Sequence, residues 1–269
     1  MKTALLLALL LILTGCAPAQ PPPAVEVMAP VEAPPVLSLG LAATAHLGRS
    51  MHATEAFPGR VQLEVAVAAV LVDESGVIRR CTIDGVRAIV PFDQNGAPLL
   101  YPGTAFPSKC ALGEDYGMAR ASSLGQEWDT QAARLARDCI GKTAAQLLGG
   151  DVTTSVTIAA SDALYAVAEA AENAAPCDAT ETDNLTLTCA ALLTDAAAPT
   201  AEISGCIALR CAAMVQAGGA ERTCTLTAHV PLTSTGRLAC ATDAGCSPLS
   251  QVLRPGRFTE EDRQLLARN

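Results

Sequence analysis

The sequence predicts an α+β fold: an antiparallel β-sheet packed by two or three helices and followed by a small Cys-rich β appendix. Three observations lead to this prediction. Apolar residues alternate along the segments before residue 96, as in half-buried strands. Between residues 127 and 173 they recur instead at the spacing of amphipathic helices. After residue 176, seven of the eleven Cys lie among short strand-like segments.

The first part of the predicted fold is an antiparallel meander. Leu37–Leu41 alternates over a short strand, and Val61–Val72 alternates over a longer one. The turn sequence Asp73–Gly76 then leads into a return strand, Val77–Ile83. A further short strand is predicted over Arg87–Phe92, directly before the turn-forming sequence Asp-Gln-Asn-Gly.

A first helix is predicted from a stripe of apolar residues at positions i, i+4, i+7 and i+11. The stripe consists of Trp128, Ala132, Leu135 and Cys139. Gly141 is suited to end this helix, because glycine adopts the left-handed conformation that follows many helices. A second short helix is expected over Lys142–Leu148.

One more strand and one more helix are predicted before residue 175. Thr153–Ile158 is rich in β-branched residues, which favour a strand. Ser161 and Asp162 have side chains that cap helices, so a helix is expected to begin there and to run to about Asn173. Its predicted core-facing stripe consists of Leu164, Val167 and Ala171.

The chain also contains a weak internal repeat. Val67–Val70 precedes Arg80–Ile83 across a turn with glycine, and Cys211–Met214 precedes Thr223–Leu226 in the same way. The alternative is a chance similarity in an Ala-rich chain. The second copy lacks a counterpart of the helix at Trp128, so we interpret it as a degenerate β repeat whose small core needs stabilisation by cysteines.

The N-terminus has the order of a secretory signal peptide. Lys2 is followed by the apolar run Leu5–Leu13 and by the small residues Thr14 and Gly15. Cys16 comes next, as in a bacterial lipobox, where the Cys thiol is acylated and becomes the new N-terminus. The alternative is an ordinary signal peptide with a nearby Cys. We therefore expect an extracytoplasmic protein that is anchored to the cell membrane by a lipid on Cys16.

These patterns divide the chain into five parts. They are a signal peptide (residues 1–15), the lipidated Cys with a Pro-rich extended tether (16–36), an α+β domain (37–175), the Cys-rich β repeat (176–258) and a C-terminal helical tail (259–269). Thr259 and Asp262 are suited to cap the tail helix.

Composition excludes several classes of partner and site. The net charge is −9 and Lys/Arg residues form no cluster, which argues against nucleic acid. Without Cys16, ten Cys remain, an even number that predicts disulfides in an exported protein. The Cys spacing includes no C-x-x-C pair, so no metal site is expected. No motif for a catalytic nucleophile or a phosphate-binding loop is present in the sequence.

The segment before the first helix is the best candidate for a ligand site. It holds Tyr116, Gly117 and Trp128, the single Trp of the chain, and glycine lets a ligand approach the backbone closely. It leads into a helix N-terminus, where free N–H groups receive anions such as phosphate. The alternative is that Trp128 is a core anchor and Tyr116 a packing residue with a hydrated hydroxyl.

Residues 59–170 resemble a group of exported proteins of gut Firmicutes. The shared sequences are Asp115–Met118, Ser122–Trp128, Gly141–Thr143 and Ser155–Ile158, in the same order. More remotely, the order resembles the FMN-binding domains of flavin-carrying subunits in sodium-pumping quinone reductases and related lipoproteins. That resemblance implies an FMN-binding-like domain over residues 37–175, with a groove for a planar, anionic ligand between Tyr116–Trp128 and Thr153–Thr157.

The chain departs from that family where FMN would be attached. The family has S-G-A-T, whose Thr takes FMN by a phosphoester, and this chain has Thr153–Thr157 without the Gly and Ala. We therefore expect no covalent FMN on Thr154 or Thr157. The candidate ligand-binding residues are Tyr116, Gly117, Ser122, Ser123, Trp128, Thr154 and Thr157.

The leading functional hypothesis is a non-catalytic binding or accessory module at the cell surface. The alternative is an extracellular electron-transfer protein that holds FMN and meets a membrane or surface redox partner.

Overall fold

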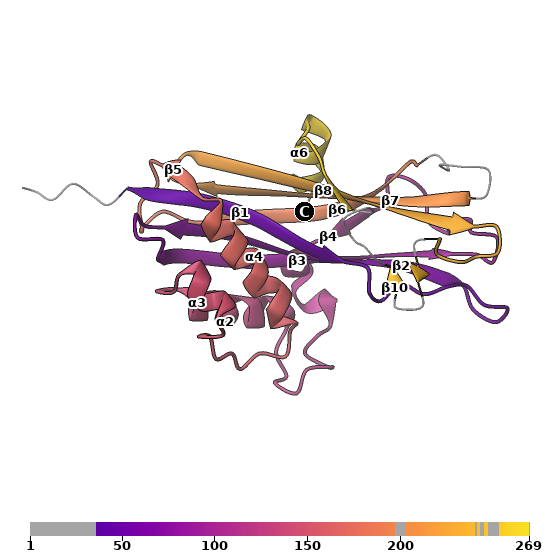
Figure 1. The fold of residues 1–269 in the computed structure, drawn as a ribbon, viewed down its shortest axis with the longest axis horizontal. Helices are drawn as coiled ribbons and strands as arrows, with labels where there is room; N and C mark the ends of the chain where they lie inside the picture. The colour runs from indigo at the N-terminus through magenta and orange to yellow at the C-terminus, as the bar shows by residue number, and fades with distance from the viewer. Residues whose placement is uncertain (1–35, 197–202, 240, 243–244, 247–252, 269) are drawn as a thin grey trace, which may run out of the picture. The chain divides into compact units, whose positions relative to one another are not determined.

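The computed structural model describes residues 36–196, 203–239, 241–242, 245–246 and 253–268. Residues 34–269 form one compact unit. It contains two antiparallel β-sheets together with helices, so the predicted α+β class is confirmed (Figure 1). Cys16, the predicted signal peptide and the tether up to residue 35 lie outside the described residues.

The first sheet has four strands in the order β3-β2-β1-β5, and the second has five in the order β11-β8-β7-β6-β4. A separate two-stranded ladder joins β9 and β10. The strands are β1 (Leu37–His46), β2 (Gly59–Val72), β3 (Ile78–Phe92), β4 (Ala105–Pro107), β5 (Ala175–Cys177), β6 (Thr186–Thr194), β7 (Ile203–Ala217), β8 (Ala220–Thr233), β9 (Ala241–Thr242), β10 (Gly245–Cys246) and β11 (Leu253–Pro255).

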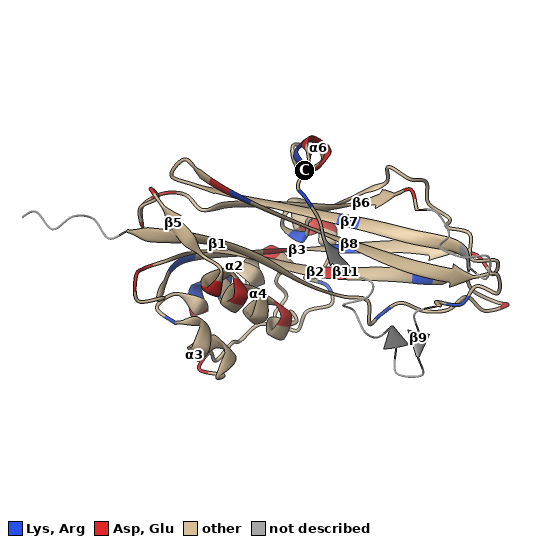
Figure 2. Cartoon of the chain, turned by 45° about the horizontal axis from the view of Figure 1, so that its top comes forward, with Lys and Arg blue, Asp and Glu red and all other residues tan. Residues whose placement is uncertain are grey.

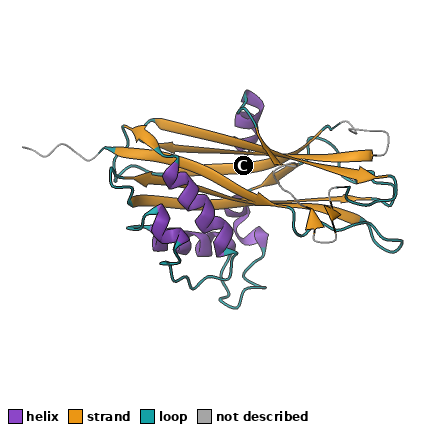
Figure 3. Ribbon diagram, viewed as in Figure 1, coloured by secondary structure: helices purple, strands orange, loops and turns teal. Residues whose placement is uncertain are grey.

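The helices cover the outer faces of the two sheets (Figure 3). They are α1 (Lys109–Leu112), the 3₁₀-helix η1 (Gly113–Tyr116), α2 (Trp128–Cys139), α3 (Ala144–Leu148), α4 (Ala160–Glu172) and α6 (Glu260–Leu266). α2, α3 and α4 pack on the first sheet, and α6 packs on the second. α6 has three acidic residues in its first turn (Figure 2), and Asp262 among them forms an ion pair with Arg210 of β7 at 2.6 Å.

The main core lies between the inner faces of the two sheets. Alternate residues of β2, such as Leu63 and Val65, share this core with Ile207 and Leu209 of β7 and with Val230 of β8. Each sheet therefore buries its apolar face against the other, as in a β-sandwich. Residues 176–258 supply half of this common core within the compact unit and are not a detached appendix.

The two three-stranded meanders, β1–β2–β3 and β6–β7–β8, are alike in topology and in the turn that follows each. After β3, the Gly96 N–H donates to the carbonyl of Asp93 at 3.1 Å; after β8, the Gly236 N–H donates to the carbonyl of Thr233 at the same distance. Both glycines have positive φ, which these tight turns require. The geometry supports the internal repeat that the sequence indicates, and it extends the similarity to these turns.

Several predicted elements are confirmed. α2 spans Trp128–Cys139, with the predicted stripe buried, and Gly141 follows its end at φ 81°. The predicted capping box at Thr259 and Asp262 begins α6. The predicted short helix of residues 142–148 is present as α3, which begins two residues later at Ala144.

Three local predictions are wrong. The predicted strands Val77–Ile83 and Arg87–Phe92 are one strand, β3, because its ladder with β2 continues without a break through Asp84 and Gly85. Thr153–Ile158 is not a strand. It crosses the helical layer, where the Thr157 N–H donates to the Gln131 side chain at 2.7 Å and no sheet edge is paired with it.

The third correction concerns α4. Its N-cap is Ala159, which makes no side-chain cap, so Ser161 and Asp162 lie inside the first turn. Of the predicted core-facing stripe, Val167 is fully buried, and Leu164 and Ala171 are half-buried at the margin of the same core. The other buried residues of α4 are Ala163, Ala166, Ala168 and Ala170. The face of α4 that carries Ala170 lies very close to β1. Only glycine fits at position 40 of β1, because a Cβ there would lie 1.8 Å from the carbonyl oxygen of Ala170.

Among the described residues, no helix is both long enough and apolar enough to cross a membrane.

Candidate functional site

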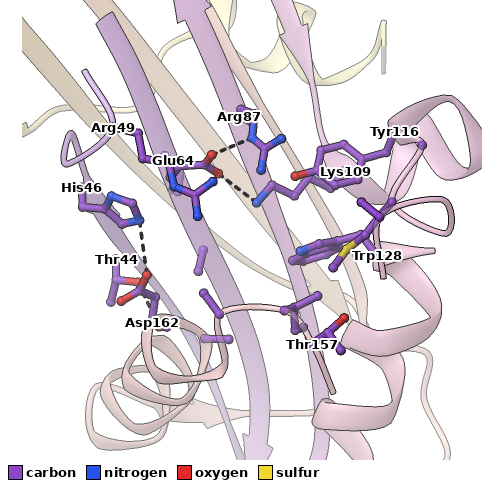
Figure 4. Close-up of a pocket in the computed structure, with 18 residues that line it drawn as sticks. Thr44, His46, Arg49, Glu64, Arg87, Lys109, Tyr116, Trp128, Thr157 and Asp162 are labelled. Carbon is purple, nitrogen blue, oxygen red and sulfur yellow. Dashed lines mark hydrogen bonds and ion pairs between the residues drawn. The ribbon is translucent and has the colours of Figure 1, made fainter. Parts of the chain in front are cut away.

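A cavity of about 400 Å³ opens on the outer face of the first sheet (Figure 4). Its floor is formed by β1, β2 and β3. One wall is the N-terminal end of α4, and the other is the segment from α1 through η1 to the start of α2. The cavity thus lies where the helical layer leaves part of the sheet uncovered.

A charged cluster forms the centre of the floor. Glu64 of β2 lies 2.6 Å from the Nε of Arg87 and 3.0 Å from the Nζ of Lys109. Its Oε1 also accepts a hydrogen bond from Gln62 at 2.7 Å. Burial raises the pKa of Glu64, but attraction to Lys109 and the hydrogen bonds from Arg87 and Gln62 outweigh burial, so this pKa lies below its usual value. Glu64 is therefore a carboxylate at neutral pH.

Two aromatic rings flank the Lys109 ammonium. Its Nζ lies 5.1 Å from the Trp128 ring centre and 5.6 Å from that of Tyr116, both within the range of a cation–π contact. The Arg87 guanidinium lies 5.1 Å from the same Tyr116 ring. The Trp128 indole packs over Gly85 of β3, 3.6 Å from the position that a Cβ would take there, which is ordinary van der Waals contact.

The position of Lys109 is set by the first turn of α1. Ser108 accepts a hydrogen bond from the Ala111 N–H at 3.0 Å, and Asp84 accepts one from the Cys110 N–H at 3.1 Å. Asp84 is only 4 % exposed and belongs to β3. The strand therefore holds the short helix, and the helix holds the ammonium over the floor of the cavity.

The opposite wall carries a second pair. His46 Nε2 lies 3.4 Å from Asp162 Oδ2, and the Thr44 hydroxyl donates to the Asp162 carbonyl at 2.9 Å. Arg49, at the rim, makes no ion pair with the described residues. With His46 neutral, three cations (Arg49, Arg87 and Lys109) and two carboxylates (Glu64 and Asp162) give the lining a net charge of +1, in a chain of net charge −9.

The structure brings together four of the residues predicted from sequence. Tyr116, Gly117, Trp128 and Thr157 all line the cavity. Ser122 lies behind Thr157, with 2.8 Å between the two hydroxyl oxygens.

Three of the predicted residues are not in the cavity lining, namely Ser122, Ser123 and Thr154. The Thr157 hydroxyl also donates to Gln131 at 3.0 Å. The one predicted Thr in the lining is thus held by two side-chain partners, and this does not fit a free attachment point for a flavin phosphate.

At the N-terminus of α2, where the sequence predicts a site for an anion, the structure places two carboxylates. The N-cap is Glu127, whose carboxylate accepts from the N–H groups of Met118 and Ala119 at 2.8 and 3.1 Å. Asp129 adds a second negative charge in the first turn, which repels anions. The N-terminus of α4 also lies in the cavity wall, opposite the start of α2.

Sequence reasoning missed the charged residues of the cavity: Arg49, Glu64, Arg87, Lys109, and the pair His46 and Asp162. One signal was available for Glu64, because it is the one charged residue in the strand Val61–Val72. A charge in such a strand is rarely buried without a partner, and here two cations are its partners.

Within the described residues, eight cysteines carry free thiols: Cys81, Cys110, Cys139, Cys177, Cys189, Cys206, Cys211 and Cys224. A hydrogen bond with Cys139 and burial raise the pKa of Cys81, so these two thiols are neighbours across β3 and α2. Disulfide formation among Cys177–Cys246 stays a prediction.

In the same part of the chain, no group of three or more His, Cys, Asp or Glu residues is arranged to hold a metal ion. Comparison of the sequence and fold with protein-family models, curated proteins and solved structures gives no match.

Proposed function

We propose that this protein is a non-catalytic binding module that holds a small planar anion in the cavity on the first sheet. The observation that carries the proposal is the placement of Lys109 between Trp128 and Tyr116 in a positively charged cavity of an acidic chain. Aromatic rings favour a flat, conjugated ligand through stacking. The cationic groups favour a negative substituent on it.

The chemistry of the floor supports binding rather than acid–base catalysis. Glu64 already accepts hydrogen bonds from three side chains, and its lowered pKa makes it a weak base. Arg49 is the cation with no ion-pair partner among the described residues, so it is the group we assign to the anionic substituent of the ligand.

Fluorescence of Trp128 tests the proposal directly, because it is the single Trp in the chain. A panel of planar anions, namely FMN, pyridoxal 5′-phosphate and indole-3-acetate, is titrated against the protein, with riboflavin as the counterpart of FMN that lacks the phosphate. We expect at least one anion to change the fluorescence, and FMN to bind more tightly than riboflavin if FMN binds at all. Absence of any response to the panel would overturn the proposal.

Charge variants supply the matched control. Arg49→Gln removes the free cation at the rim and is expected to weaken binding of the responding anion. Arg134→Gln removes an exposed arginine of α2 that is outside the cavity lining and is expected to leave binding unchanged. Equal effects of the two variants would show that overall charge, and not the cavity, attracts the ligand.

The second candidate function is extracellular electron transfer with bound FMN. It is favoured by one observation, the presence of Thr157 in the same cavity as the two aromatic rings. Co-expression with a flavin transferase and intact-mass measurement test it. We expect no added FMN phosphoester, and a gain of that mass that Thr157→Ala abolishes would favour this second function.

We further propose that the protein works outside the cytoplasm, attached to the cell membrane by a lipid on Cys16. The sequence Leu13-Thr14-Gly15-Cys16 before a Pro-rich segment supports this localisation.

A further inference from the structure

We infer that Lys109 captures its ligand covalently and reversibly, as an iminium with a small conjugated aldehyde that bears an anionic group. This inference rests on the proposed function, because it places the reacting carbonyl in the same cavity. It adds the chemical class of the ligand, an aldehyde, and the atom that recognises it, Lys109 Nζ.

The geometry that points to Lys109 is its position in the cavity wall. Lys109 is the single lysine in the lining, it is 8 % exposed, and its Nζ faces both aromatic rings. The caps by Ser108 and Asp84 fix the backbone from which it extends. A lysine amine that is buried and held at one point, with a second cation (Arg87) on the same carboxylate, is an arrangement in which lysines form imines.

Burial of Lys109 favours its neutral form more than water does. Burial lowers the pKa of Lys109 and Arg87 lowers it further, while Glu64 and Asp84 raise it, and the net result is a pKa below the usual value. A larger fraction of free amine is then present at neutral pH than for an exposed lysine.

The reaction balances without any oxidant or reductant. The neutral amine of Lys109 attacks the aldehyde carbon, so that a C–N bond forms and the C–O π bond becomes a hydroxyl. Loss of this hydroxyl as water then gives the C=N bond. Starting from the ammonium, the total change is ammonium plus aldehyde to iminium plus water, with no net gain or loss of protons.

Glu64 has a defined part in this step. The iminium keeps the positive charge of Lys109, so the carboxylate at 3.0 Å remains its counter-ion before and after reaction. Trp128 and Tyr116 then lie beside the conjugated system of the bound aldehyde. Arg49, without an ion-pair partner among the described residues, is available to the anionic group.

Pyridoxal 5′-phosphate is a suitable probe, since it is a planar aldehyde with a phosphate. The full chain is incubated with pyridoxal 5′-phosphate, and borohydride then reduces any imine to a stable secondary amine. Peptide mass spectrometry shows which lysine carries the label. The chain has three lysines, Lys2, Lys109 and Lys142, so each is assigned separately. Lys142, half-buried and outside the cavity lining, is the matched control.

We expect the label on Lys109 and not on Lys142, and we expect Lys142→Arg to leave it unchanged. Lys109→Arg keeps the positive charge and is expected to abolish the label at position 109. A second test does not depend on the folding of that variant. The unchanged protein is labelled with pyridoxal 5′-phosphate in the presence of pyridoxine 5′-phosphate, the corresponding alcohol, which cannot form an imine. This competitor is expected to protect Lys109 from labelling. Equal labelling of Lys109 and Lys142, or no protection, would overturn the inference.

Trp128 fluorescence separates failure of this inference from failure of the proposed function. If pyridoxine 5′-phosphate changes the fluorescence but pyridoxal 5′-phosphate leaves no label on Lys109, planar anions bind and the covalent step is wrong. Both proposals fail if three results occur together: neither compound changes the fluorescence, no label forms on Lys109, and no other anion of the panel gives a response.

Discussion

Replacing Glu64 by Gln keeps the shape of the side chain and removes the negative charge at the floor of the cavity. Arg87 and Lys109 then lose their shared carboxylate and repel each other, and Lys109 is left as a buried cation without a counter-ion at hydrogen-bonding distance. We expect a clear loss of stability that has its origin in this one cluster.

The magnitude follows from burial. The Glu64 side chain is 9 % exposed and that of Lys109 is 10 % exposed, whereas the Arg87 side chain is 36 % exposed and keeps access to water. Removing one partner of a buried ion pair costs about 3–5 kcal/mol, and the exposure of Arg87 places this case at about 3 kcal/mol. For a unit of this size, that loss corresponds to a decrease in Tm of about 6–12 °C.

Urea unfolding, followed by circular dichroism and Trp128 fluorescence, measures the change in free energy of unfolding. Glu221→Gln is the control, since Glu221 pairs with Arg263 at 2.7 Å but the two side chains are 33 % and 43 % exposed. Its expected cost is below about 1 kcal/mol. The double variant Glu64→Gln/Lys109→Met removes the uncompensated cation and is expected to be about 2 kcal/mol more stable than Glu64→Gln alone.

The pH dependence has a defined sign. The pKa of Glu64 in the folded protein lies below the value of 4.5 for the unfolded chain. Its contribution to stability is therefore present above pH 4.5 and is lost as the pH falls through the lower, folded pKa. The difference between the natural protein and Glu64→Gln should shrink over that acidic range. A cost no larger than that of Glu221→Gln, or a difference that does not shrink in acid, would refute the reasoning.

Three further predictions follow from the same chain. Tyr116→Ala and Trp128→Phe are expected to weaken binding of the responding anion, measured by titration calorimetry because the second variant lacks the single Trp; unchanged affinity in both would leave these rings a purely structural role. Trp128→Ala is also expected to cost about 3–5 kcal/mol of stability, because the indole is buried. Cys16→Ser is expected to move the protein from the membrane to the soluble fraction, and continued sedimentation with membranes would contradict lipidation. Most of Cys177–Cys246 are expected to be oxidised in the exported protein, with a loss of about 2–5 kcal/mol for each bridge that is reduced. Thiols are counted on the unfolded, unreduced mature protein, and a count of about seven or more free thiols would show the opposite.

The sequence alone determined the elements whose periodicity is local. The alternation of Val61–Val72 predicted most of β2, and the stripe from Trp128 to Cys139 predicted α2. The capping box at Thr259 predicted the start of α6. In each case the signal lies within one or two turns or a few strand residues, so it does not depend on what packs against the element.

Tertiary packing decided the elements for which local propensity and available partners disagree. Thr153–Ile158 has the composition of a strand, yet its backbone is bound to Gln131 in the helical layer. The Ala170 face of α4 lies very close to β1, an approach that only glycine at position 40 allows. A strand needs a free edge and a helix face needs a complementary surface, and neither requirement is written in the segment itself.

The candidate site shows the same division. Tyr116 and Trp128 were identified from sequence because rare aromatic residues stand beside glycines in one segment. The cluster that gives the cavity its charge was not, since Glu64 is 23 residues from Arg87 and 45 from Lys109 in sequence. Strand pairing of β2 with β3, and docking of α1 on β3, bring each of the two cations within 3.0 Å of the Glu64 carboxylate. Each of these charges would be an ordinary surface residue in isolation, and burial against the others makes them a site.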